Sequence, residues 1–155
     1  MYKIVTFDLD KPAFRDLIPM TDATLRVAIL VASDKLVLKY QRNVRSPTLF
    51  CWQDELDSLQ VIDEIYIYSL SGEMICRLAE NAVGQIDAYG REAHPWLFIA
   101  MSGFTSPSTI GLYDFSAPDH KRWSIYRTTV LNGLNPDEFE ARQVSFESIL
   151  THCHP

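Results

Sequence analysis

Three copies of a strand–turn–strand unit set narrow limits on the fold of this chain. Each copy is an apolar run, a polar turn and a second apolar run, at residues 3–18, 64–78 and 109–129. With Ile4, Ile65 and Ile110 taken as equivalent, the two intervals are 61 and 45 residues. The longer interval contains the polar-flanked stretch 44–59, which we interpret as an insertion. Without it the period is about 45 residues, the length of a four-stranded β-propeller blade.

Apolar and β-branched runs separated by turn residues cover most of the chain, which is typical of an all-β fold. The predicted strands are residues 2–9, 14–18, 25–32, 35–42, 64–70, 73–78, 84–89, 96–102, 109–115, 122–129 and 140–147. A further strand pair lies between successive copies of the unit, so each period holds four strands. Only residues 53–60 look weakly helical, and residues 132–138 can form a single helical turn.

One predicted strand is apolar on both of its faces. Ile65 and Ile67 point to one side and Tyr66, Tyr68 and Leu70 to the other. A strand in a β-sandwich would alternate apolar with polar residues, whereas a blade packed between two neighbours is covered on both sides. The sequence therefore predicts an all-β, partial β-propeller; an antiparallel sandwich with uneven strand spacing is the alternative.

The length of the chain allows only part of a propeller. Its 155 residues hold about two and a half four-stranded antiparallel blades. A closed propeller needs at least about four blades, and open terminal blades expose unpaired strand edges. We therefore expect the chain to belong to a larger fold.

Composition excludes several classes of protein. The formal net charge of −6 argues against binding to nucleic acid, which needs a basic face. No apolar stretch approaches the roughly 20 residues of a membrane-spanning helix, and the N-terminus does not resemble a signal peptide. Three cysteines without short spacing, Cys51, Cys76 and Cys153, indicate free thiols rather than a disulfide framework or zinc ribbon. We expect a reducing, cytoplasmic location.

The sequence contains no recognisable catalytic motif. A hydrolase nucleophile elbow needs Gly-x-Ser-x-Gly, which does not occur. His94 precedes a proline and His120 lies in a polar turn, so both are expected to be solvated loop residues. The run His152-Cys153-His154 has zinc-ligating chemistry, but three ligands in a terminal tail do not make a fixed site. We expect a frayed terminus there.

The remaining candidates have structural interpretations. Cys76 is expected to be a small core residue, and Cys51 an exposed residue of the insertion. The acidic residues 54–57 lack the ligand spacing of a calcium site and are expected to form a solvated loop. Eight aromatic residues at strand spacing are expected to form blade core: Tyr66, Tyr68, Trp96, Phe98, Tyr113, Phe115, Trp123 and Tyr126. The prediction is that the chain holds no catalytic residue, no cofactor-binding residue and no metal ligand.

Six segments, in this order, give the sequence a resemblance to the prolyl oligopeptidase family of serine peptidases. They are Tyr-Lys-Ile-Val-Thr-Phe-Asp-Leu from residue 2, Ser-Asp-Lys-Leu-Val-Leu-Lys-Tyr-Gln from 33, Tyr-Ser-Leu-Ser-Gly-Glu from 68, Val-Gly-Gln-Ile from 83, Ser-Gly-Phe-Thr-Ser-Pro-Ser-Thr-Ile-Gly-Leu-Tyr from 102 and Phe-Glu-Ala-Arg-Gln-Val-Ser-Phe-Glu-Ser from 139. They resemble the last blades of the seven-bladed propeller of that family. The resemblance covers residues 1–148 apart from 44–59, whereas the tail 149–155 departs from the family pattern.

The resemblance implies a parent enzyme that cleaves short peptides after proline. In that family an α/β-hydrolase domain carries the Ser, Asp and His triad, and the propeller restricts entry to small peptides. That domain and the early blades are absent here, so no catalytic residue can be transferred to this sequence. The implied partners are the peptidase domain, the remaining blades and short proline-containing peptides. The alternatives are a stand-alone binding or assembly module and a non-functional truncated product.

Overall fold

A computed structural model describes residues 3–10, 12–46, 58–80, 84–103 and 108–130, with residues 133, 135, 138 and 139. Ten β-strands follow one another in these residues, and no α-helix occurs among them. A 3-10 turn, η1 (Asp119–Lys121), precedes the last strand. The strands are β1 (Ile4–Asp8), β2 (Ala13–Ile18), β3 (Thr24–Val31), β4 (Lys35–Ser46), β5 (Ser58–Ser69), β6 (Met74–Leu78), β7 (Gln85–Gly90), β8 (Trp96–Ser102), β9 (Thr109–Asp114) and β10 (Trp123–Thr128).

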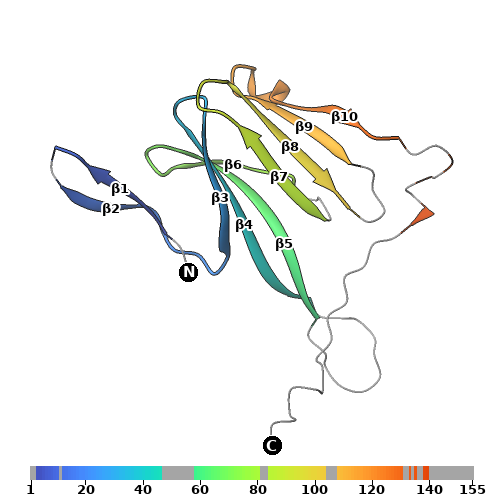
Figure 1. The fold of residues 1–155 in the computed structure, drawn as a ribbon, viewed down its shortest axis with the longest axis horizontal. Helices are drawn as coiled ribbons and strands as arrows, with labels where there is room; N and C mark the ends of the chain where they lie inside the picture. Colours follow the sequence, from blue (N-terminus) through green and yellow to red (C-terminus); the bar gives the residue numbers. More distant parts are fainter. Residues whose placement is uncertain are drawn as a thin grey trace, which may run out of the picture.

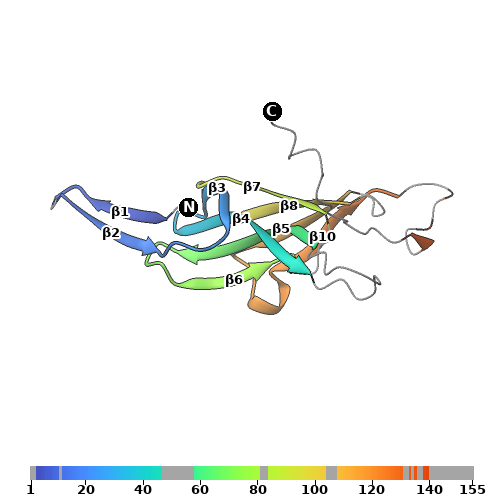
Figure 2. The same cartoon turned by 90° about the horizontal axis from the view of Figure 1, so that it is seen from below.

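The strands form three antiparallel sheets in which neighbours in sequence are neighbours in space (Figure 1). Strands β1 and β2 form a two-stranded sheet, which we call the half-blade. The middle blade has the order β3-β4-β5-β6, and the last blade has the order β7-β8-β9-β10. Figure 2 shows the half-blade projecting from one end of the two larger sheets. The predicted all-β partial propeller of about two and a half blades is confirmed.

The strand boundaries agree with the sequence except around residues 44–59. Strands β4 and β5 run into this stretch from both sides and pair there, with Val44 opposite Gln60 and Ser46 opposite Ser58. The weak helix predicted at 53–60 is therefore wrong at residues 58–60, because ladder pairing with β4 holds that backbone extended. Residues 53–57 and the predicted strand 140–147 lie outside the described residues. In the predicted turn at 132–138, the Glu138 N–H donates to the Asn135 carbonyl (3.1 Å).

The main apolar core lies between the middle and last blades, and we call this interface the seam. Its fully or nearly buried side chains come from the seven strands β3 to β9: Val31, Val37, Ile65, Ile67, Leu78, Ile86, Leu97, Ile99 and Tyr113. Burying one such aliphatic side chain contributes about 1.5–3 kcal/mol. The seam therefore holds the two blades together as one packed unit.

A second core covers the opposite face of the middle blade. Leu38 and Tyr40 of β4 pack there with Ile18 and Ala23, and Tyr66 and Tyr68 border the cluster. Ile65 and Ile67 thus face the last blade while Tyr66 and Tyr68 face the half-blade, as predicted for a strand buried on both sides. Leu70 instead lies in the β5–β6 turn and is exposed.

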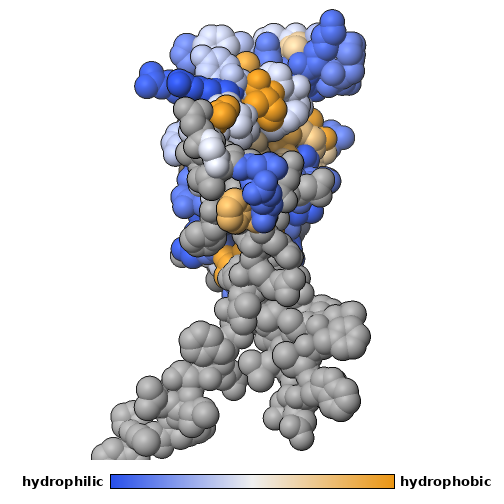
Figure 3. Space-filling model, turned by 90° about the vertical axis from the view of Figure 1, so that its right-hand side faces the viewer, coloured by the Kyte–Doolittle hydropathy of each residue, from blue (hydrophilic) through white to orange (hydrophobic). Residues whose placement is uncertain are grey.

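The prediction that all eight aromatic residues form blade core is only partly correct. Tyr113 is buried and Tyr66, Tyr68, Phe98 and Phe115 are half-buried, but Trp96, Trp123 and Tyr126 are exposed. Every residue of β10 is exposed, since β10 is the edge strand of the last blade and no described strand packs on its outer side. Figure 3, which faces the side of the molecule at the right of Figure 1, shows apolar side chains among hydrophilic ones at this surface.

Candidate functional site

A pocket lies where the edges of the middle and last blades meet. Strands β3 and β7 are edge strands of their sheets, and they contact each other. The pocket has a volume of about 470 Å³, within the range of roughly 300–1,000 Å³ typical of small-ligand sites. We call it the edge pocket; it is lined by Ile29, Ala88, Tyr89, Gly90, Arg91, His94, Trp96 and Phe98. All but Ile29 come from β7, β8 and the loop between them.

Backbone hydrogen bonds fix the loop that forms one wall of the edge pocket. In the β3–β4 turn, the Ala32 N–H donates to the His94 carbonyl (3.1 Å) and the Ser33 N–H to the Glu92 carbonyl (2.9 Å). On the other side, the Phe115 N–H donates to the Pro95 carbonyl (2.8 Å). The loop 91–95 is therefore held by two separate elements of the fold.

The turn that holds this loop is itself strained. Ala32 and Ser33 have φ values of 52° and 65°, in the left-handed region that residues with a Cβ seldom adopt. Each such residue costs roughly 1 kcal/mol or more. The strain is offset where both N–H groups donate across the seam to loop 91–95. The wall of the pocket is thus positioned before any ligand arrives.

The side chains of the edge pocket combine stacked rings with a cation. The rings of His94 and Trp96 are stacked, with centroids 4.7 Å apart and planes 9° apart. Phe98 meets Tyr126 edge to face at 5.3 Å. Arg91 is exposed and has no ion pair or hydrogen bond to its side chain among the described residues. The arrangement suits a ligand with an apolar body and a negative charge.

A buried cluster of charges crosses the seam beside the apolar core. Lys39 Nζ of β4 lies 2.9 Å from Asp63 Oδ2 of β5 and 2.9 Å from Asp87 Oδ1 of β7. Burial alone lowers the pKa of Lys39, but hydrogen bonds and charges from the two carboxylates outweigh it and raise that pKa. The hydrogen bond from Lys39 lowers the pKa of Asp87.

Neighbouring amides complete this cluster. Gln41 Nε2 donates to Asp63 Oδ1 (3.3 Å) and Gln85 Nε2 to Asp87 Oδ2 (2.7 Å). The Ile86 backbone N–H donates to Asp63 Oδ2 (3.2 Å), which links β7 to β5. Buried charges are stable only when paired and hydrogen-bonded in this way. The sequence-based predictions do not include this cluster, although Lys39, at an inward position of β4 between Val37 and Gln41, was a usable signal.

A second set of charges lies on the opposite face of the middle blade. The Glu64 carboxylate accepts from Arg42 Nε (3.2 Å), Arg77 Nη2 (2.8 Å) and the Tyr66 hydroxyl (3.2 Å). Arg42 also pairs with Asp22, which lies between the half-blade and the middle blade. These contacts connect structural elements and leave Glu64 fully engaged, so they do not form an open site.

The remaining candidate residues from the sequence lie apart from one another. His120 is exposed in η1, as predicted, whereas His94 is half-buried against Trp96 instead of solvated. The prediction for His94 is wrong because the β3–β4 turn and the Trp96 ring hold its loop against the sheet. Cys51, the acidic residues 54–57 and the run His152-Cys153-His154 lie outside the described residues. Within the described ranges no three His, Cys, Asp or Glu side chains come together as a metal site.

Cys76 is a half-buried residue packed against the seam, in agreement with its predicted core role. Its thiol lies 3.6 Å from the Tyr113 hydroxyl, to which it donates. Burial raises the pKa of this thiol, and Tyr113 and Arg122 offset only part of the increase. Cys76 is therefore a packing residue with a protonated thiol, not an activated nucleophile.

This architecture defines the chain as part of a β-propeller. A family model described as "Prolyl oligopeptidase, N-terminal beta-propeller domain" matches residues 1–125. The chain belongs to the prolyl oligopeptidase family, with its described strands in the propeller region of that family. Among the described residues, no helix is long and apolar enough to cross a membrane.

Fungal relatives give the extent of the similarity. The chain is 44% identical over 148 residues to prolyl oligopeptidase A of Galerina marginata and 43% identical over 150 residues to the dual function macrocyclase-peptidase POPB of Amanita bisporigera. Each match covers 95% of this chain and 18% of the relative. The chain thus spans less than a fifth of the length of these curated relatives.

A solved structure supports the same arrangement. Prolyl oligopeptidase B from Galerina marginata, bound to a 35mer hydrolysis and macrocyclization substrate, superposes with a TM-score of 0.76 at 40% sequence identity. The match covers 96% of this chain and 19% of that one. The same protein without substrate gives a TM-score of 0.73.

Proposed function

We propose that residues 1–155 form part of the propeller of a serine endopeptidase that cleaves short peptides after proline. In this proposal the propeller portion admits small peptides and excludes folded proteins, and the Ser, Asp and His of catalysis lie outside residues 1–155. The chain itself then contributes no catalytic residue, cofactor ligand or metal ligand. The observation that carries the proposal is the family match over residues 1–125, together with the 40–44% identity to prolyl oligopeptidases.

The geometry of the chain supports a role in a larger assembly. The half-blade has two strands where the other blades have four, and the outer side of β10 is exposed along its whole length. Exposed strand edges and apolar surface favour pairing with further strands. We therefore propose residues 1–148 as a partial propeller with a loop insertion at 44–59, followed by a divergent tail at 149–155. Its partners are the remaining blades and an α/β-hydrolase domain, in the cytoplasm.

The test compares the short chain with the protein that contains it in its source. Antibodies against the exposed residues 116 and 118–121 identify that protein after fractionation. Each fraction is then assayed with a proline-directed fluorogenic peptide and labelled with a fluorophosphonate. We expect turnover and label to follow an immunoreactive species larger than 17.8 kDa.

The recombinant 155-residue chain is the control in the same assays. We expect it to give neither turnover nor label. Turnover that co-purifies with the short chain would contradict its non-catalytic role. A source protein of 17.8 kDa only, soluble and oligomeric, would instead support a stand-alone binding or assembly module.

A further inference from the structure

We propose that a projecting part of strands β4 and β5 is a contact surface for the α/β-hydrolase domain of the full-length enzyme. This part consists of residues 42–46 and 58–62, and we call it the ribbon. The proposal rests on the proposed function, in which such a domain accompanies the propeller, and it names the part of this chain that the domain touches.

The ribbon extends past both neighbouring strands of the middle blade. Strand β3 pairs with β4 only as far as Gln41, and β6 pairs with β5 only as far as Ile65. Strands β4 and β5 stay paired for five further residue pairs, which join 42–46 to 58–62. At about 3.4 Å per residue, the ribbon reaches about 15 Å beyond the last rung of β3. Figure 1 shows β4 and β5 continuing past the end of β3.

The ribbon has the properties of a surface that a partner covers. Two paired strands without a third strand or a packed face are marginally stable in water. Within the ribbon, Val61 lies opposite Asn43, and both residues are exposed, Val61 to 42%. A partner that removes Val61 from water therefore stabilises the ribbon.

The root of the ribbon is held in place. Arg42, its first residue on β4, donates through Nε to Glu64 of β5 (3.2 Å) and also pairs with Asp22 of the β2–β3 connection. These contacts fix the direction in which the ribbon leaves the sheet. Because this direction is set beforehand, a partner loses less free energy to ordering of the protein when it docks.

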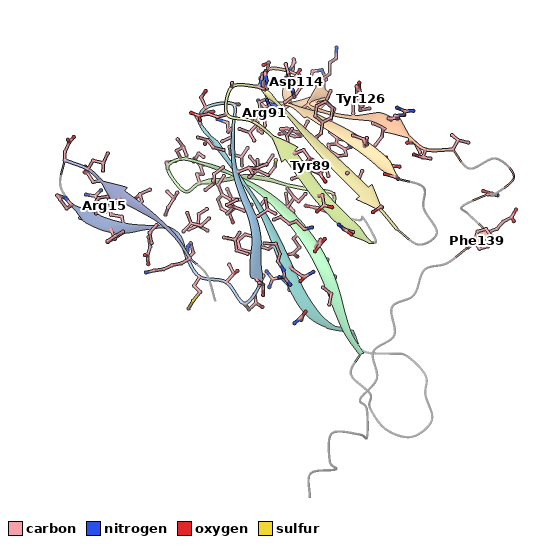
Figure 4. The ribbon with its side chains drawn as sticks, in the orientation of Figure 1. Arg15, Tyr89, Arg91, Asp114, Tyr126 and Phe139 are labelled. Carbon is pink, nitrogen blue, oxygen red and sulfur yellow. The ribbon has the colours of Figure 1, made fainter. Side chains whose placement is uncertain are left out.

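The ribbon and the end of β10 lie at the same end of the blades. The middle and last blades each have four antiparallel strands, so the chain enters and leaves each of them at one end, which we call the exit end. Strand β10 ends there at Thr128, and Val130 just beyond it is 79% exposed. In Figure 4, Arg91 and Asp114 lie at the opposite end, whereas Phe139 lies beyond the exit end.

Further blades do not take this position. Blades pack through the faces of their sheets, and the middle blade has the half-blade on one face and the last blade on the other. The ribbon instead continues in line with the strands, past these faces. Hydrogen bonds from Ala32 and Ser33 to loop 91–95 join the two blades at their opposite ends, so their exit ends lie on one side. A domain that follows β10 begins on that side and is placed to cover the ribbon.

The test identifies what lies against the ribbon in the full-length enzyme. The protein that contains residues 1–155 is expressed at its natural length with a photoreactive benzophenone amino acid in place of Asn43. The matched control carries the same group in place of Asp34, which is exposed at the other end of β4. After irradiation, mass spectrometry identifies the cross-linked peptides. We expect position 43 to cross-link to peptides of the α/β-hydrolase domain, and position 34 not to.

Variants show whether Val61 is part of the contact. We expect Val61→Asp to reduce the yield of the cross-link from position 43 about tenfold, because a carboxylate loses its hydration when a partner covers it. Leu70→Asp is the matched control, since Leu70 is 50% exposed just past the other end of β5. It should leave the yield unchanged. Val61→Thr keeps the shape of the side chain and should reduce the yield by a smaller factor, even if Val61→Asp does not fold.

Three results would overturn the inference. They are cross-links from position 43 that are confined to propeller peptides or to a second copy of the protein, equal yields of hydrolase cross-links from positions 43 and 34, and unchanged yields in Val61→Asp and Val61→Thr variants that keep their thermal unfolding transition. A fluorophosphonate label on the same protein tests the proposed function separately. A labelled enzyme with these cross-links elsewhere overturns only the role of the ribbon, whereas a protein with neither label nor proline-directed turnover overturns the proposed function.

Discussion

Lys39 Nζ of the middle blade and Asp87 Oδ1 of the last blade are 2.9 Å apart and form an ion pair across the seam. The two residues are 48 positions apart in the sequence and belong to different sheets. Most of the seam is aliphatic, so this pair and Asp63 place charge where apolar contacts otherwise dominate. If the two blades docked in another register, Lys39 would be buried without a partner, which is strongly unfavourable. The cluster therefore favours the correct docking of the two blades.

Replacing Lys39 with methionine should destabilise the protein by about 3 kcal/mol, because Asp63 would remain buried without its cation. Asp63 has a side chain only 8% exposed. Urea unfolding measures the free energy of unfolding, and the parent and the variant should share the same dependence of that free energy on urea concentration.

Lys3→Met is the matched control, since Lys3 and Asp16 form an ion pair at 2.7 Å in which both side chains are more than half exposed. That variant should lose less than about 1 kcal/mol. Equal losses in both variants would contradict a special role for the seam pair.

Acid should weaken the seam through Asp87. The hydrogen bond from Lys39 lowers the pKa of Asp87 in the folded protein below its unfolded value of about 3.9. This carboxylate therefore stabilises the fold above pH 4, and its contribution is lost as the pH falls toward the lowered pKa. We expect Asp87→Asn to be less stable than the parent at pH 7 and to approach the parent below pH 4. Chemical denaturation at several pH values measures this; a constant difference down to pH 2 would argue against the ion pair.

The thiol of Cys76 should react slowly in the folded protein. Burial raises its pKa, so less thiolate is present at pH 8, and the Tyr113 side chain covers it on one side. In a Cys51→Ser, Cys153→Ser background, alkylation by iodoacetamide should be at least about tenfold slower in buffer than in urea. Equal rates in the two conditions would show that the thiol is accessible and that the packing around Cys76 is loose.

The propeller fold could be predicted because its signals are local and repeated. The period that links Ile4, Ile65 and Ile110 corresponds to β1, β5 and β9, the first strands of three equivalent hairpins. The alternation of Ile65 and Ile67 with Tyr66 and Tyr68 correctly gave two buried faces. Side-chain period and strand length depend on neighbouring residues, so a single sequence contains them.

The candidate site could not be predicted because it depends on contacts between blades. The sequence predicts a solvated His94, since nothing in its neighbourhood reveals that Ala32 and Ser33 adopt positive φ and hold its loop. The pairing of Lys39 with Asp87 also depends on how two sheets dock. Exposure of Trp96 and Tyr126 depends on which side of the last blade lacks a neighbour. Each of these features depends on contacts between segments that are far apart in the sequence. The same residue type occurs in several such environments, so the local sequence does not reveal them.

Adding a methyl group at Gly90 should separate the two edge strands that border the pocket. A Cβ there would lie 2.6 Å from Val31 Cγ2, closer than Cβ atoms approach other atoms in proteins, and at a tight 3.2 Å from Leu97 Cδ1. Because Val31 is fully buried in the seam, it cannot simply move into solvent. We expect Gly90→Ala to cost about 1–3 kcal/mol of stability in urea unfolding.

Val31→Ala alone should also destabilise the protein, because it removes buried methyl groups. In the double variant the clash is absent, so its loss should be smaller than the sum of the two single losses by more than about 0.5 kcal/mol. Strict additivity would show that β3 and β7 do not touch at these positions, and that the pocket between them has a different shape.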